Sequence, residues 1–565
     1  MMNFLSTLVL ALTGLSVISS AAEKNERPNI LFIMSDDHSY QATSLYRSRL
    51  AKLNPTPNLD RFAKNGMVFN SVFCSNSICT PSRASIITGQ YSHRNGVRDL
   101  YASLPGARHH LPREMRAAGY NTAVVGKWHL KESPQNFDFF SVIAGQGRYM
   151  NPVLHVSEGG EVRKMRYSST LSREVPVIDT KGHSSDVLTD ISLDWLDKKR
   201  DRTKPFFLMH HFKAPHDMFV SAPRYQNYLK DADIPEPTNL YDQPEPNFGS
   251  IATRGEDDSL VGVIGSTISP QPKKRNLSRY YREQIKTLTG KDKPSDREMT
   301  HHSYQLYLKD YLRCVKGIDD NLQRIFDYLK AKHLLENTIV VYTSDQGMML
   351  GEHDYIDKRW MYEESMRMPL IVHWPKMIKA GARCNWLINN TDFAPTLLSL
   401  AGLPTPEYME GRSFAPALGG APQPQDWRSG TYYRYWMHMA HGHNNPAHLG
   451  IRARDAKLIF YYGSDFTDIH GGRKVAGKDG NRYWENTPAA WEFYDLVRDP
   501  SEMHNRYHDP AYREKIATMK ADLAKMYQEI DDGDKDLPRL RKRIKQHWSD
   551  TPTQDKSHKD RSQKQ

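Results

Sequence analysis

A cysteine and an arginine four residues apart open what reads as a short helix. The stretch runs from Cys79 through Arg83 to Gly89. Its first residues suit the opening turns of a helix, and Gly89 is the usual C-terminal stop. Cys79 would then lie at the positive end of a helix dipole, which favours an anion, with Arg83 one turn away on the same face. The pattern fits an oxyanion site, and equally a buried cysteine in a surface helix.

Four apolar runs each end in polar residues with chemical potential. The runs cover residues 29–34, 120–125, 206–211 and 338–343, and they read as buried strands. The residues that follow them are Asp36 and Asp37, Lys127 and His129, Lys213 and His216, and Asp345 and Gln346. Any one of these groups could belong to a solvated loop. Because the carboxyl ends of parallel strands meet at one edge of a sheet, four of them together predict a single site.

The side chains at these strand ends, together with Arg83 and with Lys358 further along the chain, divide by chemistry into three groups. The oxygen ligands suit a hard divalent cation, Ca²⁺ before Mg²⁺, and disfavour zinc: Asp36, Asp37, Asp345 and Gln346. The cations Lys127, Lys358 and Arg83 suit the oxygens of an anionic group. His129 and His216 can move protons near neutral pH. Together they predict hydrolysis of a sulfate or phosphate ester.

The elements that must position these residues alternate between strands and helices. This order predicts an α/β fold with a mostly parallel central sheet flanked by helices. Apolar residues spaced by three and four predict a long amphipathic helix from Leu308 to Leu329. Residues 217–302 read as an irregular insertion, too long for a plain connector and expected to pack near the site. The catalytic domain is predicted over 23–412 and a smaller subdomain with antiparallel strands and a helix over 413–536.

Charge is unevenly placed along the chain. The net charge is +11, and residues 538–565 hold nine Lys or Arg against three Asp, a contribution of +6. The body is therefore only mildly basic, without the basic stripe and interleaved aromatic residues of a nucleic-acid-binding protein. A polyanionic substrate remains compatible. Residues 537–565 read as a basic disordered tail.

Two features concern the cellular compartment. An apolar run from Phe4 to Ile18, followed by Ser and Ala residues, predicts a signal peptide over residues 1–22 and export to the periplasm or outside. No later apolar stretch is long enough to span a bilayer. The four cysteines do not form the dense pattern of a disulfide-stapled fold.

Several motifs resemble those of type I sulfatases and occur in that family's order. Cys79 to Arg83 followed by Thr88-Gly89 is similar to the signature C-x-P-S-R-x-x-x-x-T-G, and Gly126 to Leu130 resembles the second sulfatase signature. Other matching stretches are Ser35–His38, Lys213–His216, Ser344–Gly347 and Gly351–His353. The resemblance covers roughly residues 28–527. It implies an alkaline-phosphatase-like fold.

The resemblance also implies roles for individual residues. Cys79 would be oxidised to Cα-formylglycine (3-oxoalanine) by a separate maturation enzyme, and its hydrate would attack sulfur. Asp36, Asp37, Asp345, Gln346 and residue 79 would hold one Ca²⁺ ion, although many relatives carry Asn where Gln346 stands. Arg83 and His129 would orient and deprotonate the hydrate. Lys127 and Lys358 would neutralise sulfate oxygens, Lys213 would contribute to substrate binding, and His216 would protonate the leaving alcohol.

The substrate is predicted from weaker motifs. Residues 136–140, 145–152 and 357–365 resemble carbohydrate sulfatases, most of all bacterial N-acetylglucosamine-6-sulfatases of glycosaminoglycan breakdown. Sulfatases of algal polysaccharides such as ulvan or carrageenan share much of the pattern. Asp357 and His448, the latter from the histidine-rich run of His438, His441, His443 and His448, are the candidate sugar contacts. A phosphoester or phosphonate hydrolase of the same superfamily and a non-catalytic glycan-binding protein are the alternatives.

Overall fold

The structure is a computed structural model that describes most of the chain. The described residues are 27–143, 145–157, 165–168, 173–241, 249–255, 260–272, 275–466 and 486–549. The predicted signal peptide and the last part of the predicted tail, 550–565, lie outside them. Within these ranges, no helix combines the length and the apolar character needed to cross a membrane.

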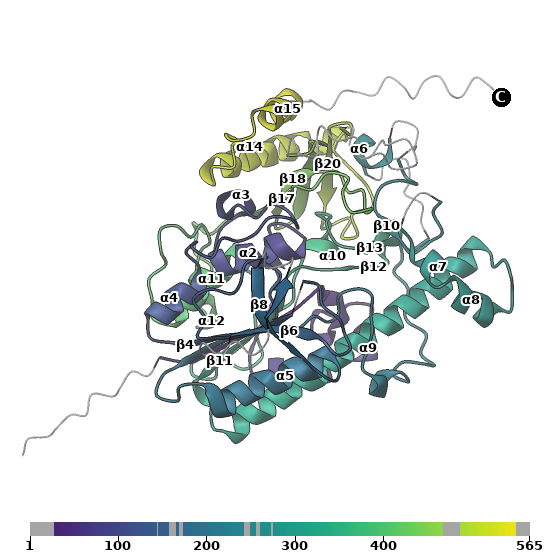
Figure 1. Cartoon of the computed structure of the whole chain (residues 1–565). Helices are drawn as coiled ribbons and strands as arrows, with labels where there is room; N and C mark the ends of the chain where they lie inside the picture. Colours follow the sequence, from purple (N-terminus) through teal and green to yellow (C-terminus); the bar gives the residue numbers. More distant parts are fainter. Residues whose placement is uncertain are drawn as a thin grey trace, which may run out of the picture.

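An eleven-stranded sheet forms the centre of the molecule (Figure 1). Its strands, in spatial order, are β15 (Ala382–Cys384), β2 (Met67–Phe69), β14 (Leu370–His373), β11 (Thr338–Ser344), β1 (Asn29–Ser35), β9 (Phe206–His211), β4 (Asn121–Lys127), β5 (Phe139–Ile143), β6 (Val153–Ser157), β8 (Arg173–Asp179) and β7 (Met165–Ser168). The run from β11 to β5 is parallel, whereas β14, β6 and β8 pair antiparallel with their neighbours. The predicted α/β fold with a mostly parallel centre is confirmed.

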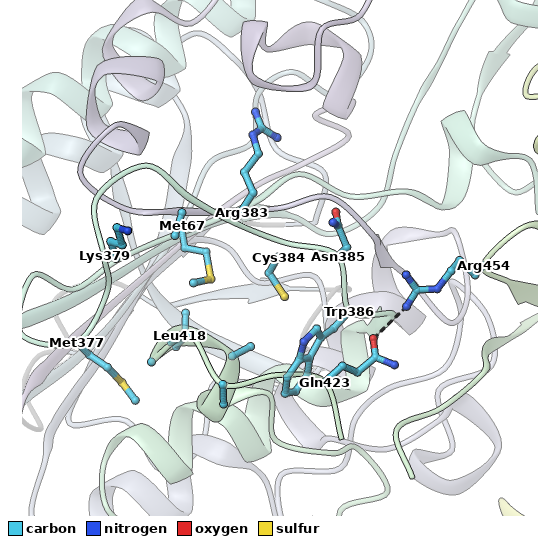
Figure 2. A pocket seen from close by; sticks show the side chains of 15 residues that line it. Met67, Met377, Lys379, Arg383, Cys384, Asn385, Trp386, Leu418, Gln423 and Arg454 are labelled. Atoms are coloured by element: carbon cyan, nitrogen blue, oxygen red, sulfur yellow. Dashed lines mark hydrogen bonds between the residues drawn. The ribbon is translucent and has the colours of Figure 1, made fainter. Parts of the chain in front are cut away.

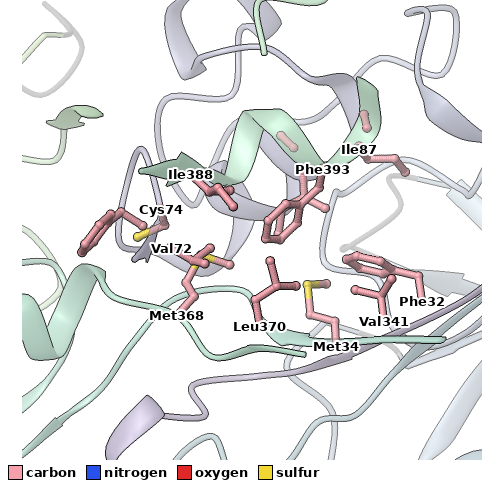
Figure 3. Close-up of a cluster of buried hydrophobic side chains, with 14 of the residues drawn as sticks. Phe32, Met34, Val72, Cys74, Ile87, Val341, Met368, Leu370, Ile388 and Phe393 are labelled. Atoms are coloured by element: carbon pink, nitrogen blue, oxygen red, sulfur yellow. The ribbon is translucent and has the colours of Figure 1, made fainter. Parts of the chain in front are cut away.

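Helices cover both faces of this sheet, because alternate residues of each central strand point to opposite sides. Leu31 and Ile33 of β1 pack with α1 (Pro57–Ala63), α5 (Ser184–Asp194) and α9 (Asp296–Ala331). Phe32 and Met34 pack on the other face with α2 (Cys79–Thr88), α4 (Leu111–Ala117) and α11 (Phe393–Leu400). Figure 3 shows Phe32 and Met34 beside Phe393 of α11. This two-sided burial explains why the strands are continuously apolar.

Helix α9 is longer than its apolar periodicity predicts. It begins at Asp296 rather than near Leu308, and Ser295 and Glu298 form a capping box at its start. The first turns bury Met299, Ser303 and Tyr304 instead of an aliphatic stripe. The first turns of α9 therefore lack the regular aliphatic residues from which the helix was predicted, and aromatic and small polar side chains are buried there instead.

The insertion of residues 217–302 contains more regular structure than expected. It carries α6 (Ile251–Arg254), β10 (Ser266–Thr267), α7 (Leu277–Tyr280) and α8 (Arg282–Thr289). Strand β10 pairs with β13 (Tyr355–Asp357), which in turn pairs with β12 (Met349–Leu350). Since β13 ends at Asp357, the insertion packs beside the candidate site, as predicted.

The C-terminal part is a separate antiparallel sheet covered by helices. Its strands are β17 (Gly430–Tyr435), β18 (His448–Ala453), β19 (Ala456–Tyr461) and β20 (Ala490–Asp495). Helices α14 (Arg513–Glu529) and α15 (Pro538–Trp548) share one hydrophobic cluster with this sheet. Shorter elements are α3 (Ser92–Asn95), α10 (Glu363–Met366), α12 (Ala415–Leu418) and the pair β3 (Val72–Phe73) and β16 (Ile388–Asn389).

Helix α15 corrects the prediction of disorder for residues 538–548, whereas residues 550–565 lie outside the described residues. Leu540 and Ile544, four residues apart, are buried against the C-terminal sheet. Trp548 contacts Trp491 with ring centroids 5.3 Å apart. The sequence predicted disorder here because Lys and Arg occupy most of the helix surface and leave only a narrow apolar stripe.

Candidate active site

The four predicted strand ends meet at one edge of the sheet. Ser35, the last residue of β1, lies opposite Ser344, the last residue of β11. On the other side of β1, Met34 lies opposite His211 of β9, and His211 lies opposite Gly126 of β4. The residues that follow these strands therefore emerge side by side, which confirms the predicted convergence.

Helix α2 delivers Cys79 and Arg83 to this edge. It begins at Cys79 and ends at Thr88. Gly89 follows as the C-cap, with a φ of 66° in the left-handed conformation that glycine adopts readily. Every residue of α2 is buried, so it is a core helix rather than a surface helix. Arg83 donates from Nε to Asp345 Oδ2 at 2.9 Å and from Nη1 to the main-chain oxygen of Lys127 at 2.6 Å. One guanidinium thus connects α2, β11 and β4.

Three carboxylates form a compact buried cluster. Oxygens of Asp36, Asp37 and Asp345 lie within 4.8 Å of one another. Burial and the charge of Asp36 raise the pKa of Asp345 to about 8. Burial alone would raise the pKa of Asp36 too, but the charges of Lys127, His216 and Arg83 hold it well below its ordinary value. The raised pKa of Asp345 shows that a further negative charge beside Asp36 is unfavourable in this buried cluster, which is the condition that a divalent cation relieves.

Within the described part of the chain, two buried oxygens without hydrogen bonds support the same reading of this cluster, and one of them, Asp36 Oδ1, lies 3.4 Å from Arg83 Nη2. Asp36 Oδ1 and Gln346 Oε1 are buried and accept no hydrogen bond from the described residues. Buried polar atoms are normally satisfied, so such oxygens mark a place for a ligand. Gln346 Nε2 donates to Asp37 Oδ1 and lies 3.9 Å from Cys79 Sγ. The oxygen-only donor set fits Ca²⁺ or Mg²⁺.

Cys79 faces this cluster but is a poor thiol nucleophile. Its Sγ lies 4.0 Å from Lys127 Nζ. Burial raises the pKa of the thiol, and the opposing effects of Lys127 and Lys358 do not overcome burial. Reactive cysteines have a lowered pKa, so the surroundings of Cys79 do not generate a thiolate.

Three lysines surround the cluster. Lys127 donates to Asp36 Oδ2 and to Gln146 Oε1, the latter at 2.6 Å. Lys358 donates to Asp37 Oδ2 at 2.6 Å. Lys213 is also buried, with Nζ 4.7 Å above the ring of Tyr149, and burial together with the charge of Lys127 lowers its pKa to about 8. Lys127 and Lys358 are therefore anchored at the cluster, and Lys213 lies at its margin.

The two predicted histidines take different positions. His129 Nδ1 lies 3.4 Å from Thr80 Oγ1, next to Cys79 in sequence. Burial and the charge of Lys127 lower the pKa of His129 well below its ordinary value, so its neutral ring can accept a proton. His216 directs Nε2 toward Asp37 Oδ2 at 3.8 Å and Nδ1 toward Asp217 Oδ1 at 2.8 Å.

The structure separates the two predicted sugar contacts. Asp357 is at the site, 3.2 Å from Lys358 Nζ and 2.7 Å from Arg359 Nε. His448 is in the core of the C-terminal sheet, stacked on Tyr433 at 5.5 Å, and does not line the site. The histidine that reaches Asp357 is His443, with Nδ1 3.2 Å from Asp357 Oδ2. The structure thus places His443, rather than His448, beside Asp357, because His448 begins β18 and packs in the C-terminal sheet.

Four residues of the site have a strained backbone. Asp37, His129, Asp357 and Arg359 all adopt positive φ values, of 67°, 57°, 75° and 90°. Non-glycine residues enter this conformation only where the surroundings impose it, most often at functional sites. The strained positions include a predicted metal ligand, a proton acceptor and a sugar contact.

Sequence reasoning missed four polar residues of the site: Gln146, Asp217, Arg275 and His443. Arg275 Nη2 contacts Asp217 Oδ2 at 2.5 Å, and Arg275 Nη1 lies 3.3 Å from His443 Nε2. Asp217 directly follows the predicted His216, and Gln146 lies in a motif that already pointed to carbohydrate sulfatases. Arg275 had no comparable signal, since it lies in a stretch without periodicity.

A separate pocket lies at the sheet edge, over β2 and β15 (Figure 2). Its lining includes Met67, Cys384 and Trp386, and Arg454 there donates to Gln423 at 3.1 Å. None of the predicted site residues lines it. This pocket is therefore distinct from the strand-end site.

Comparisons with known proteins identify the family of the chain. The sequence model of the family described as "Sulfatase" matches residues 28–403, and one described as "N-sulphoglucosamine sulphohydrolase, C-terminal" matches residues 351–474. The chain is 36% identical to an N-acetylglucosamine-6-O-sulfatase of Bacteroides thetaiotaomicron, over 94% of this chain and 92% of that protein.

Solved structures extend the comparison to the fold. A protein in complex with its substrate D-glucosamine-2-N,6-O-disulfate is 34% identical, with a TM-score of 0.75 over 90% of this chain and 99% of that one. A phosphonate monoester hydrolase of Silicibacter pomeroyi is 20% identical with a TM-score of 0.62, over 89% and 95%, and shares the fold. The chain belongs to the sulfatase family and is a sulfuric ester hydrolase.

Proposed function

We propose that the chain hydrolyses a sulfate ester of a sulfated saccharide, with residue 79 converted to formylglycine. Ca²⁺ would be held by that residue together with Asp36, Asp37, Asp345 and Gln346. The overall reaction adds water across the ester and yields sulfate and the free sugar hydroxyl. The observation that carries the proposal is the position of Cys79, which opens a buried helix beside three carboxylates and Lys127.

The chemistry of residue 79 supports the modification. Its buried thiol has a raised pKa, so a role as thiolate is disfavoured. When present, the formylglycine hydrate would supply an oxygen nucleophile, and Ca²⁺ would draw charge from the sulfate oxygens. Lys127 and Lys358, both buried and both acting electrostatically on Cys79, would bind those oxygens.

The two histidines suit opposite proton transfers. His129 is neutral because burial and Lys127 lower its pKa, so it would accept the proton of the nucleophile. His216 would donate a proton from Nε2 to the oxygen of the leaving alcohol. Arg83, tied to Asp345 and to Lys127, would hold the first turn of α2 in place.

A saccharide is the substrate class that the relatives favour. The similar N-acetylglucosamine-6-O-sulfatase and the solved disulfated glucosamine complex support a 6-O-sulfated amino sugar as the first substrate to test. Asp357, at the margin of the site, would contact the sugar. Sulfated algal polysaccharides of the ulvan or carrageenan type are the second candidate.

Hydrolysis of a phosphoester or phosphonate is the weaker reading. The likeness to a phosphonate monoester hydrolase concerns the fold, at 20% identity. Parallel kinetics on matched sulfate and phosphate monoesters of one sugar separate the two activities. A preference for the phosphate would contradict the proposal.

Export and maturation complete the proposal. The apolar run from Phe4 to Ile18 supports a cleaved signal peptide and a periplasmic or secreted enzyme. The motif from Cys79 to Arg83 would be read by a separate formylglycine-generating enzyme. Cell fractionation tests the location, and a full-length protein retained in the cytoplasm would contradict export.

Two measurements test the function as a whole. The matured enzyme is incubated with a panel of defined sulfated saccharides, and the sulfate that leaves is identified. We expect 6-O-sulfate release from glucosamine derivatives. In parallel, mass spectrometry of the peptide around residue 79 should show an aldehyde in place of the thiol. An active enzyme with unmodified cysteine would overturn the proposed modification.

A further inference from the structure

His216 is held by the residue that follows it. Its Nδ1 donates toward Asp217 twice, to Oδ1 at 2.8 Å and to the main-chain oxygen at 2.7 Å. Its Nε2 lies on the opposite side of the ring, 3.8 Å from Asp37 Oδ2. A hydrogen bond on one ring nitrogen sets which tautomer and which direction the other nitrogen presents. Asp217 therefore fixes Nε2 toward the carboxylate cluster.

Asp217 is in turn held by Arg275 of the insertion. Arg275 Nη2 contacts Asp217 Oδ2 at 2.5 Å, so the two carboxylate oxygens of Asp217 face different partners. Arg275 Nη1 lies 3.3 Å from His443 Nε2, and His443 Nδ1 lies 3.2 Å from Asp357 Oδ2. The same small cavity is lined by Asp217, Arg275, His443 and Asp357. A continuous polar chain thus runs from His216 to Asp357.

We propose that Asp217 is a positioning residue that holds His216 as the proton donor to the leaving alcohol, and that Arg275 of the insertion holds Asp217 in place. The inference rests on the role of His216 in the proposed function. As the oxygen nucleophile bonds to sulfur, the bond between sulfur and the sugar oxygen breaks. Its electron pair stays on the sugar oxygen, and the proton on His216 Nε2 neutralises that oxygen. The Asp217 carboxylate stabilises the protonated ring, as a carboxylate does for histidine in other enzymes.

The leaving group makes this role measurable. A sugar hydroxyl is a poor leaving group, so loss of proton donation leaves more negative charge on the bridging oxygen in the transition state. The kinetic isotope effect of ¹⁸O at that bridging position should then increase. A variant that merely loosens the fold lowers the amount of active enzyme and does not change this isotope effect.

The experiment compares four variants of the matured enzyme on the sugar sulfate that it hydrolyses fastest. They are Asp217→Asn, Arg275→Met, Arg275→Lys and His216→Gln. Arg279→Met is the control, because Arg279 lies in the same insertion on α7, is exposed, and donates to Asn276 Oδ1 through its main-chain nitrogen. For each, kcat/KM and the bridging ¹⁸O isotope effect are measured, and folding is checked by thermal denaturation.

We expect Asp217→Asn to lower kcat/KM by about 10²-fold, which is the lower end of the range for general acid catalysis. The same variant should raise the bridging ¹⁸O isotope effect toward the value in His216→Gln. Arg275→Met should shift both quantities in the same direction by less, with partial rescue in Arg275→Lys. An isotope effect in Asp217→Asn equal to wild type, beside a raised one in His216→Gln, would overturn the inference alone. An unchanged isotope effect in His216→Gln would overturn the role of His216 in the proposed function.

Discussion

Arg83 on α2 and Asp345 after β11 form a buried ion pair, with Nε and Oδ2 2.9 Å apart. The pair joins α2, which begins at Cys79, to Asp345, which directly follows β11. Arg83 also donates to the main-chain oxygen of Lys127 at 2.6 Å. The relative position of nucleophile, carboxylates and lysine therefore depends on one planar guanidinium.

Replacing Arg83 by Lys should therefore uncouple activity from folding. Lysine keeps the charge but has one nitrogen instead of a fork, so it cannot reach Asp345 and the Lys127 carbonyl together. We expect a loss of sulfatase activity of at least tenfold, with a smaller loss of stability than the roughly 3–5 kcal/mol of a fully broken buried pair. Turnover and thermal denaturation are measured on the same preparation. Wild-type activity in Arg83→Lys would contradict this dependence.

Removal of divalent cations should destabilise the folded protein as well as inactivate it. The close packing of Asp36, Asp37 and Asp345 is unfavourable without a counter-charge. Chelation should lower Tm, and Ca²⁺ at a hundred times its dissociation constant should restore about 2.7 kcal/mol. Asp345→Asn should blunt the response, whereas Asp327→Asn on the surface of α9 should not. A Tm that changes neither with chelator nor with added Ca²⁺ would rule out a divalent cation at this cluster.

Stability should depend on pH through Glu492 in the C-terminal sheet. Burial raises the pKa of Glu492 from 4.5 to about 7, although hydroxyls of Tyr362, Tyr461 and Tyr494 contact its Oε2 at 3.2, 3.3 and 3.0 Å. The folded state therefore binds a proton that the unfolded state releases. The resulting stability is fully present below about pH 4.5 and is lost as pH rises through 7.

The Glu492→Gln variant isolates this effect. The difference in unfolding free energy between wild type and Glu492→Gln should fall by roughly 3 kcal/mol between pH 4.5 and pH 7.5. This value follows from the shift in the pKa of Glu492 at about 1.36 kcal/mol per pKa unit. Glu514→Gln, at the exposed start of α14, serves as control. Parallel pH profiles for wild type and Glu492→Gln would show that Glu492 does not hold this proton.

A point variant in α15 tests the packing of that helix. Leu540 is 3% exposed against the C-terminal sheet, whereas Lys542 on the same helix is exposed. Leu540→Ala should cost about 2–5 kcal/mol of unfolding free energy, the range for buried leucines, and Lys542→Ala close to nothing. Chemical denaturation measures both. Equal, negligible effects would mean that α15 does not pack in solution.

The sequence predicted those parts of the site that a periodic pattern or a motif marks. The four strand ends follow clear apolar runs, so the sequence predicts that Asp36, Lys127 and Asp345 lie at one edge of the sheet, where the structure has them. Helix α2 is marked by Cys79 at its start and by Gly89 after its end. Arg275 could not be found this way. It reaches Asp217 only because the insertion folds back and pairs β10 with β13, a long-range contact that leaves no local signal. His443 and His448 illustrate the same limit, since composition alone did not distinguish a loop histidine from one at the start of a strand.

Cys79→Ala tests the central claim most directly. The matured wild-type enzyme and the variant are assayed for sulfate release from glucosamine 6-O-sulfate and from the other saccharides of the panel, and Cys384→Ala controls for loss of a cysteine at the sheet edge. The account predicts that Cys79→Ala remains folded and releases sulfate only at the background rate, while Cys384→Ala retains activity. Full sulfate release by Cys79→Ala would contradict the account.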